Sequence, residues 1–539
     1  MRMRTALLPI FLLATSLARS QPQLIFDINP GSASSGIAEP VEMGGVLYMR
    51  AQASGLGVEL WRTDGTATGT SLVKDIQPGS GSSVPQGFTA IGDVLYFNAN
   101  DGEHGPELWR SDGTGPGTTL VKDIRPGEHG GSPIQLMAYN GMLLFSATLP
   151  GTGNELWRSD GTEQGTELVL DIWPGSGQSV PSLFTAYQGM VYFVASDSLY
   201  GSELWRTDGT ASGTERITDI APGSAGSSIS YLTVVGDLLY FTASDPVHSA
   251  ELWRSDGTTN GTWMVKDIEP GDPAGSPRNI TELNGLVIFT AFTEATWREV
   301  WRSDGTEAGT VMIGELNPGM ADGPVSPFVL GENGLLYFSG TNGSLGSGLE
   351  LYATDGDTVY MVKDIFPGPS SSMASGLEPG CGGVLFRAND GVNGRELWRS
   401  DGTEAGTYMM GEIVPGPGPS DVWRLAQLGA QLILVANDWV LGSELWSMTC
   451  SATGVGDLGA PGGMVLYPNP VGDELLIQLP NTTGAWTLRI HDARGRLVRQ
   501  DNTSGNNAIV DVRAWSPGLY HVVAQQGGTR IGGRVMVAR

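Results

Sequence analysis

The sequence predicts an all-β protein: a closed β-propeller of about nine four-stranded blades, followed by a small C-terminal β-sandwich domain. Near copies of the motif Glu107-Leu108-Trp109-Arg110-Ser111-Asp112-Gly113-Thr114 recur along most of the chain. Each interval of about 48 residues holds four short apolar segments separated by turn signals. The 79 glycines and 32 prolines fall in short regular clusters, as expected of many tight turns between strands.

Residues 1–20 predict a secretory signal peptide. Arg2 and Arg4 form a charged start, the segment 5–18 is mostly apolar, and Ala18-Arg19-Ser20 offers small residues for cleavage. We expect the mature chain to begin at Gln21, with an uncleaved anchor as the alternative. No later run reaches the roughly 18–20 apolar residues that span a bilayer.

The repeat domain is predicted over residues 21–450. Its motif glutamates are Glu59, Glu107, Glu155, Glu203, Glu251, Glu299, Glu350, Glu396 and Glu444, at intervals of 48 five times, then 51, 46 and 48. Four strands in about 48 residues is the size of one propeller blade. Nine blades exceed the common four to eight, so eight blades or two smaller rings remain alternatives, although no linker interrupts residues 24–449.

Within one period we predict strands over residues 87–91, 94–99, 106–111 and 119–124. Their β-branched and aromatic residues favour strands over helices. The run Val94-Leu95-Tyr96-Phe97 is apolar on both faces, as a sheet packed between two others requires.

Partial motifs at the two ends of the repeat domain predict its closure. Residues 24–28 match the fourth strand of the other units, whereas the final unit stops after its third strand at residues 444–447. The first segment can therefore complete the last sheet and leave no open edge.

After residue 450 the period disappears. Residues 451–463 predict a Gly-rich linker, and residues 464–539 predict a β-sandwich with strands over 474–479, 486–491, 508–512 and 519–524.

The C-terminal motifs carry a resemblance to a known family. Tyr467-Pro468-Asn469-Pro470, the segment 490–496, and Ser516-Pro517-Gly518-Leu519-Tyr520 together resemble the C-terminal sorting domain of type IX secretion substrates. That family commonly ends in Lys-rich tails, where this chain has arginines. The resemblance implies export by the type IX machinery, then removal of the domain or attachment to the cell surface. An ordinary sandwich module is the alternative.

The repeats resemble the ELWxxDGTxxGT repeats of large exported bacterial proteins and, more distantly, kelch-type blades. This resemblance implies a propeller and names no activity.

The formal charge of −27 is unevenly distributed. Residues 464–539 hold eight Arg against five acidic residues and the signal peptide holds three Arg, which leaves about −33 on the repeats. Such a field repels nucleic acid and anionic membranes, and it favours cations or neutral ligands.

Residues present in nearly every blade are assigned to architecture. Trp109 is predicted to be a packed core ring, and Asp112-Gly113 a turn between the third and fourth strands. Glu107 and Arg110 are three apart and point to opposite faces of their strand. We therefore hypothesise a ring of inter-blade Glu–Arg ion pairs.

Candidate binding residues lie in the variable loops that break the symmetry. Exposed aromatics beside carboxylates suit a glycan or a divalent cation, although loop tips are often polar for solvation alone. The candidates are Asp101, Glu103, His104, Trp173, Tyr200, His248, Trp297 and Arg298.

The sequence predicts a non-enzymatic binding or scaffold protein, secreted or held at the cell surface. No GxSxG or HExxH motif is present, and no cofactor is expected, with calcium as an alternative. A hydrolase or lyase acting on extracellular polysaccharide is the alternative function. Cys381 and Cys450 either form one disulfide near the ring closure or remain two free thiols.

Overall fold

The computed structural model describes residues 22–271, 274–319, 321–343, 346–450, 465–467, 471, 473–479, 485–492, 496–503, 507–516, 518–526 and 529–537. The named secondary-structure elements in these ranges are all β-strands, and the described residues include no α-helix. This confirms the all-β class. The chain divides into two compact units, Met1–Cys450 and Ser451–Arg539. The predicted signal peptide (1–20), the predicted linker (451–463), and Pro468, Asn469 and Pro470 lie outside the described residues.

The described strands of the first unit form nine four-stranded sheets, which we number 1 to 9 in chain order. Sheets 1 to 4 are β2 (Ala38–Met43), β3 (Val46–Ala53), β4 (Gly57–Thr63), β5 (Ser71–Lys74); β6 (Gln86–Ile91), β7 (Val94–Asn100), β8 (Pro106–Ser111), β9 (Thr119–Lys122); β10 (Ile134–Tyr139), β11 (Met142–Leu149), β12 (Gly153–Ser159), β13 (Glu167–Leu170); and β14 (Ser182–Tyr187), β15 (Met190–Asp197), β16 (Gly201–Thr207), β17 (Glu215–Arg216).

Sheets 5 to 8 repeat the same antiparallel order, and sheet 9 takes its fourth strand from the start of the chain. They are β18 (Ser230–Val235), β19 (Leu238–Ala243), β20 (Glu251–Ser255), β21 (Thr262–Lys266); β22 (Arg278–Leu283), β23 (Leu286–Thr293), β24 (Trp297–Ser303), β25 (Val311–Gly314); β26 (Val329–Leu330), β27 (Leu336–Thr341), β28 (Leu349–Thr354), β29 (Val359–Lys363); β30 (Ser375–Gly380), β31 (Gly383–Asn389), β32 (Arg395–Ser400), β33 (Tyr408–Gly411); and β34 (Trp423–Leu428), β35 (Gln431–Asn437), β36 (Ser443–Thr449), β1 (Gln23–Phe26).

Strand β1 pairs antiparallel with β36, with Leu24 opposite Trp446. This is the pairing that the partial motifs at the two ends of the repeats predict. Because β1 covers β36, the backbone N–H and C=O groups along that side of β36 find partners within the chain.

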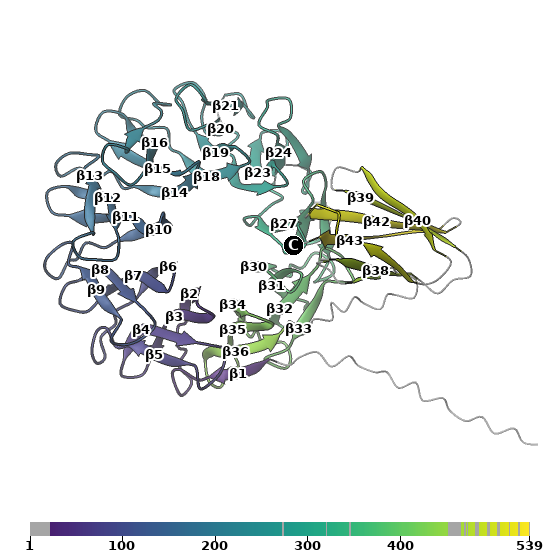
Figure 1. Cartoon of the computed structure of the whole chain (residues 1–539), viewed down its shortest axis with the longest axis horizontal. Helices are drawn as coiled ribbons and strands as arrows, with labels where there is room; N and C mark the ends of the chain where they lie inside the picture. Colours follow the sequence, from purple (N-terminus) through teal and green to yellow (C-terminus); the bar gives the residue numbers. More distant parts are fainter. Residues whose placement is uncertain are drawn as a thin grey trace, which may run out of the picture. The chain divides into compact units, whose positions relative to one another are not determined.

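Apolar clusters join each sheet to the next. Leu60 of sheet 1 packs in one cluster with Phe97 and Trp109 of sheet 2, and Met49 of sheet 1 shares another cluster with Leu445 of sheet 9. Phe97 is fully buried, and burying such a ring contributes about 1.5–3 kcal/mol. In Figure 1 the sheets follow one another around a common middle, with the first strands, such as β2, β6 and β10, innermost.

The second unit contains two sheets around one apolar core. One sheet is formed by β37 (Val465–Tyr467), β38 (Glu474–Gln478) and β41 (Asn507–Asp511), and the other by β40 (Leu497–Thr503), β39 (Trp486–Asp492), β42 (Gly518–Gln526) and β43 (Thr529–Val537). Leu475 of β38, Trp486 of β39 and Val522 of β42 belong to the same buried cluster. The two sheets therefore cover a shared core, as in a sandwich.

Candidate functional site

The motif glutamate is fully buried and ties its sheet to the connection that leads to the next sheet. Glu155 in β12 accepts hydrogen bonds from the backbone N–H of Ile172 (2.8 Å) and of Ser179 (3.1 Å), and from the Ser179 hydroxyl (2.6 Å). Burial raises the pKa of Glu155, and these hydrogen bonds oppose that rise. The carboxylate therefore stabilises the inter-sheet connection in place of backbone partners.

The motif arginine binds a backbone carbonyl in the following sheet. Nη1 of Arg110 donates to the carbonyl oxygen of Gly161 at 3.1 Å, and Nη1 of Arg158 donates to that of Gly209 at 2.9 Å. The hypothesis of inter-blade Glu–Arg ion pairs is therefore wrong. The buried glutamate instead accepts hydrogen bonds from backbone N–H groups and, in several sheets, from a serine hydroxyl. It forms no ion pair with the motif arginine of a neighbouring sheet among the described residues.

The remaining motif residues build the packing and the turn. Trp109 is only 6% exposed and packs against sheet 1. Oδ1 of Asp112 accepts from the backbone N–H (2.9 Å) and the hydroxyl (2.7 Å) of Thr114. Gly113 has φ 86°, and a Cβ on it would lie 2.1 Å from the Tyr48 hydroxyl oxygen of the preceding sheet. The turn therefore needs glycine both for its backbone and for close approach.

Cys381 and Cys450 form a disulfide with a Cα–Cα distance of 5.4 Å. Cys381 lies in the turn between β30 and β31, and Cys450 follows β36. The bond therefore joins sheet 8 to sheet 9, the sheet that β1 completes.

Two of the predicted binding loops between second and third strands contain the same hydrogen-bonded turn. Oδ1 of Asp101 accepts from the backbone N–H of Glu103 (2.9 Å) and of His104 (2.8 Å), and Oδ2 contacts Nδ1 of His104 at 2.7 Å. His248 contacts Asp245 in the same way in sheet 5. Each carboxylate raises the pKa of its histidine. These aspartates hold their own loops in shape.

Of the other predicted binding residues, Trp173 and Tyr200 lie in separate loops, and Trp297 begins β24. Trp173 lies beside Gly177, because a Cβ on Gly177 would be 2.1 Å from the indole Cδ1. The Arg216 guanidinium lies 3.2 Å from the ring centroid of Tyr200. Trp297 is 37% exposed and contacts Phe292 edge to face.

Arg298 is half-buried. Its Nη1 donates to the carbonyl oxygen of Ser276 at 2.8 Å, and burial lowers its pKa. Across the described residues, no hydrogen bond, ion pair or ring contact joins two of the predicted loops to each other. The structure therefore distributes the eight candidates over several sheets. Only Asp101, Glu103 and His104 share a hairpin, and Trp297 and Arg298 are neighbours at the start of β24.

Several hairpin tips carry exposed apolar side chains that are absent from the predicted binding residues. Val247 is 81% exposed and Trp439 62%. Leu199, Val392 and Val440 occupy the corresponding tips and are exposed too. In the sequence, an apolar residue stands two positions after the loop Asp in four hairpins, at Leu199, Val247, Val392 and Val440.

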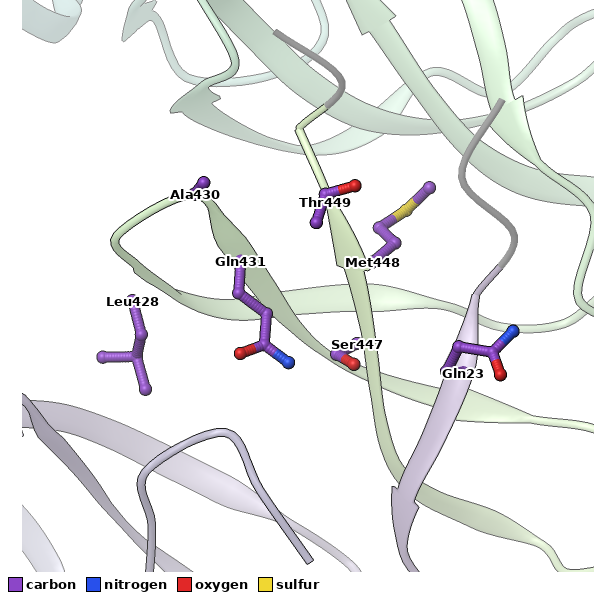
Figure 2. Close-up of a pocket in the computed structure, with 7 residues that line it drawn as sticks. All are labelled: Gln23, Leu428, Ala430, Gln431, Ser447, Met448 and Thr449. Atoms are coloured by element: carbon purple, nitrogen blue, oxygen red, sulfur yellow. The ribbon is translucent and has the colours of Figure 1, made fainter. Parts of the chain in front are cut away.

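A hollow of about 390 Å³ lies where β1 joins sheet 9. Figure 2 shows its lining residues, which are Gln23, Leu428, Ala430, Gln431, Ser447, Met448 and Thr449. Its polar groups are amides and hydroxyls, so this lining offers hydrogen bonds without a titratable side chain. Over the whole described chain, no group of three or more His, Cys, Asp or Glu could hold a metal ion.

Residues 465–538 match the family described as "Secretion system C-terminal sorting domain". The protein therefore carries a type IX sorting domain, which interacts with the secretion machinery, and it is exported to the cell surface or the medium. The described residues include no helix long and apolar enough to cross a membrane.

Comparison with curated proteins finds no match. Among solved structures, a puromycin hydrolase mutant is 15% identical, with 66% of this chain and 58% of that chain covered and a TM-score of 0.33. PorZ, a surface component of the type IX secretion system of Porphyromonas gingivalis, is 12% identical, with 96% and 100% covered and a TM-score of 0.24. The propeller domain of the Pyrococcus furiosus Trilobed protease is 11% identical, with 61% and 98% covered and a TM-score of 0.32. These values are too low to assign an activity or a partner.

Proposed function

We propose that this exported protein is a non-enzymatic binding or scaffold protein that presents its variable loops to an extracellular glycan. The observation that carries the proposal is the hydrogen bonding of the loops. The carboxylates of Asp101 and Asp245 bind donors of their own hairpins. Apolar and aromatic tips such as Val247 and Trp439 remain available to a ligand. Such tips suit the apolar faces of sugar rings better than acid–base chemistry.

A glycan array with the mature chain, followed by product analysis, tests this proposal. We expect binding of at least one extracellular glycan and no change in its length. Release of shortened or unsaturated products would instead support the alternative, a hydrolase or lyase acting on polysaccharide. The motif glutamates do not favour that alternative, because each is at most 1% exposed and cannot reach a substrate. Adding EDTA or calcium to the same assay tests for a calcium requirement.

We also propose that the first unit is a closed propeller of nine blades that acts as the rigid frame for these loops. Two observations support closure: β1 completes sheet 9, and Met49 of sheet 1 shares a core cluster with Leu445 of sheet 9. Deleting residues 23–26 exposes the edge of β36 and should lower the melting temperature and promote self-association. A deletion variant that melts like the full chain and stays monomeric would contradict closure.

A further inference from the structure

The inner part of sheet 8 contains two buried polar atoms that face no partner. Arg387 on β31 and Ser375 on β30 are direct cross-strand neighbours. Nε of Arg387 and Oγ of Ser375 are both buried without a hydrogen-bond partner among the described residues. A buried donor without a partner costs about 1–3 kcal/mol, and more when it is charged. Neither group therefore gains a hydrogen bond within the sheet.

At the corresponding position, three other sheets have a small polar side chain that donates a hydrogen bond to a backbone carbonyl near the next sheet. Asn98 of sheet 2 donates to the carbonyl oxygen of Pro133 at 3.1 Å, and Thr242 of sheet 5 donates to that of Pro277 at 2.7 Å. Ser339 of sheet 7 likewise binds the carbonyl oxygen of Ala374. Each of these small polar side chains closes the gap to the next sheet. Arg387 places a cation at this position, as Arg50 does in sheet 1. In sheet 8 the cross-strand neighbour of the arginine is the hydroxyl residue Ser375, whereas in sheet 1 it is Ala38.

Arg387 is half-buried, and its guanidinium lies beside Gly376. Gly376 is exposed, and a Cβ on it would lie 3.1 Å from Nε and 3.2 Å from Nη2 of Arg387. Its φ of 61° lies in the left-handed region, which favours glycine. Because Gly376 has no side chain, no Cβ crowds the guanidinium from this position.

Charges around Arg387 leave an excess of positive charge. Arg395 adds to the effect of burial in lowering the pKa of Arg387, whereas Asp421 and Glu378 oppose it. Glu378 also lies 3.7 Å from Nη1 of Arg424, so its carboxylate is shared between two arginines. Three arginines thus face two carboxylates, in a repeat domain of about −33.

We propose that Arg387 and Ser375 form an anion-binding site that takes the carboxylate or sulfate group of an acidic sugar. The guanidinium fork and the hydroxyl supply donors that match an oxyanion, and Gly376 leaves room for it to approach. This inference rests on the proposed glycan-binding function and narrows it to acidic glycans. The site would bind an anion locally, although the overall negative charge of the repeat domain disfavours anions.

The test compares the full exported chain with the variant Arg387→Ser, which installs the residue type of Ser339. Binding of an oligogalacturonate, a sulfated galactan oligosaccharide and a neutral galactan oligosaccharide is measured by calorimetry at fixed ionic strength. We expect Arg387→Ser to weaken the binding of at least one acidic oligosaccharide about 10- to 100-fold. Binding of the neutral oligosaccharide should be unchanged. The two acidic arms distinguish a carboxylate from a sulfate.

Two controls separate the site from charge and folding effects. Lys122→Ser removes one positive charge from the outer strand β9 and should leave acidic-sugar binding unchanged, and Arg387→Lys should bind more weakly than the parent because it lacks the fork. All three variants should melt within a few degrees of the parent. Equal binding of acidic sugars by Arg387→Ser and the parent would overturn the proposal.

Inorganic sulfate tests the anion site without any sugar. Sulfate should raise the melting temperature of the parent more than that of Arg387→Ser at matched ionic strength. If no glycan binds the parent but sulfate still stabilises the parent more than Arg387→Ser, the anion site is supported and the proposed glycan-binding function is contradicted. If the difference is absent, the anion site itself is overturned.

Discussion

The Ser179 hydroxyl donates to Oε2 of Glu155 at 2.6 Å, and the bond joins β12 of sheet 3 to the connection that enters sheet 4. Both residues are buried, so the hydroxyl offsets part of the cost of removing a carboxylate from water. We predict that Ser179→Ala lowers the free energy of unfolding by about 1–3 kcal/mol at pH 7.5, because Oε2 loses a donor. Chemical denaturation of the first unit measures the change.

The matched control for this prediction is Ser198→Ala, which removes an exposed hydroxyl in the next sheet. It should change the free energy of unfolding by less than about 0.5 kcal/mol. Equal stabilities of Ser179→Ala and Ser198→Ala would show that the buried hydroxyl contributes nothing.

Glu107 differs from Glu155 because Gly131 occupies the position of the serine. Oε1 of Glu107 accepts from the backbone N–H of Arg125 (2.9 Å) and of Gly131 (2.7 Å), whereas Oε2 is buried without a partner among the described residues. Burial raises the pKa of Glu107 to about 7. Burial is the main cause of this rise in the pKa, and Glu107 has one hydroxyl donor fewer than Glu155 to oppose it.

We predict opposite outcomes for the same substitution at these two sites. Glu155→Gln should lower stability by about 1–3 kcal/mol at pH 8, because both oxygens accept backbone N–H groups and the new amide N–H₂ must face one of them. Glu107→Gln should keep or raise stability at pH 8, because its N–H₂ can occupy the Oε2 side and no charge is buried. Melting temperatures of the two variants at pH 8 decide this, and destabilisation of both to the same extent would contradict it.

Stability should also depend on pH through several of these carboxyls. Burial raises the pKa of Glu107, Glu251, Glu299 and Glu396 to about 7 from 4.5. Between pH 4.5 and 7 the folded state therefore binds more protons than the unfolded state. Their stabilising contribution is complete below pH 4.5 and is lost as the pH rises through 7. One such carboxyl contributes on the order of 3 kcal/mol.

We therefore expect the melting temperature to fall from pH 5 to pH 8. The net charge of −27 also makes the folded chain more stable at lower pH, because protonation reduces the repulsion between carboxylates. The decisive comparison is therefore between variants. Glu107→Gln should flatten the dependence, whereas Glu404→Gln, at an exposed position, should shift it little. A Glu107→Gln curve parallel to that of the parent would contradict this account.

The sequence predicted the strands well because their signals are local and repeated. The predicted segments 94–99 and 106–111 correspond to β7 and β8, since the turns and apolar runs mark their ends. The pairing of β1 with β36 was also predictable, because two incomplete units can complete one sheet. In the second unit, β40 and β43 were not predicted, since polar residues interrupt their alternation.

The side-chain partners could not be read from the same patterns. Glu107 and Arg110 suggested an ion pair by charge alone, but a buried carboxylate is satisfied as well by backbone N–H groups, and the sequence does not show which backbone groups come near. The cation at Arg387 was missed for a related reason. Arg387 stands out only by comparison with residues such as Ser339, which has the equivalent position in sheet 7. That equivalence becomes visible only when the strand register is known.

The disulfide between Cys381 and Cys450 gives the last prediction. It closes a loop with a sequence separation of 69 residues, and the chain-entropy estimate for such a loop is about 4 kcal/mol. The double variant Cys381→Ser with Cys450→Ser should therefore unfold at a lower urea concentration than the oxidised parent. Reduction of the parent should reproduce the shift, and reduction of the double variant should change nothing. Because the bond joins sheet 8 to sheet 9, where β1 is paired, proteolysis of the reduced chain should begin near these sheets. A reduced parent with the midpoint of the oxidised chain would show that the sheet contacts hold this region without the bond.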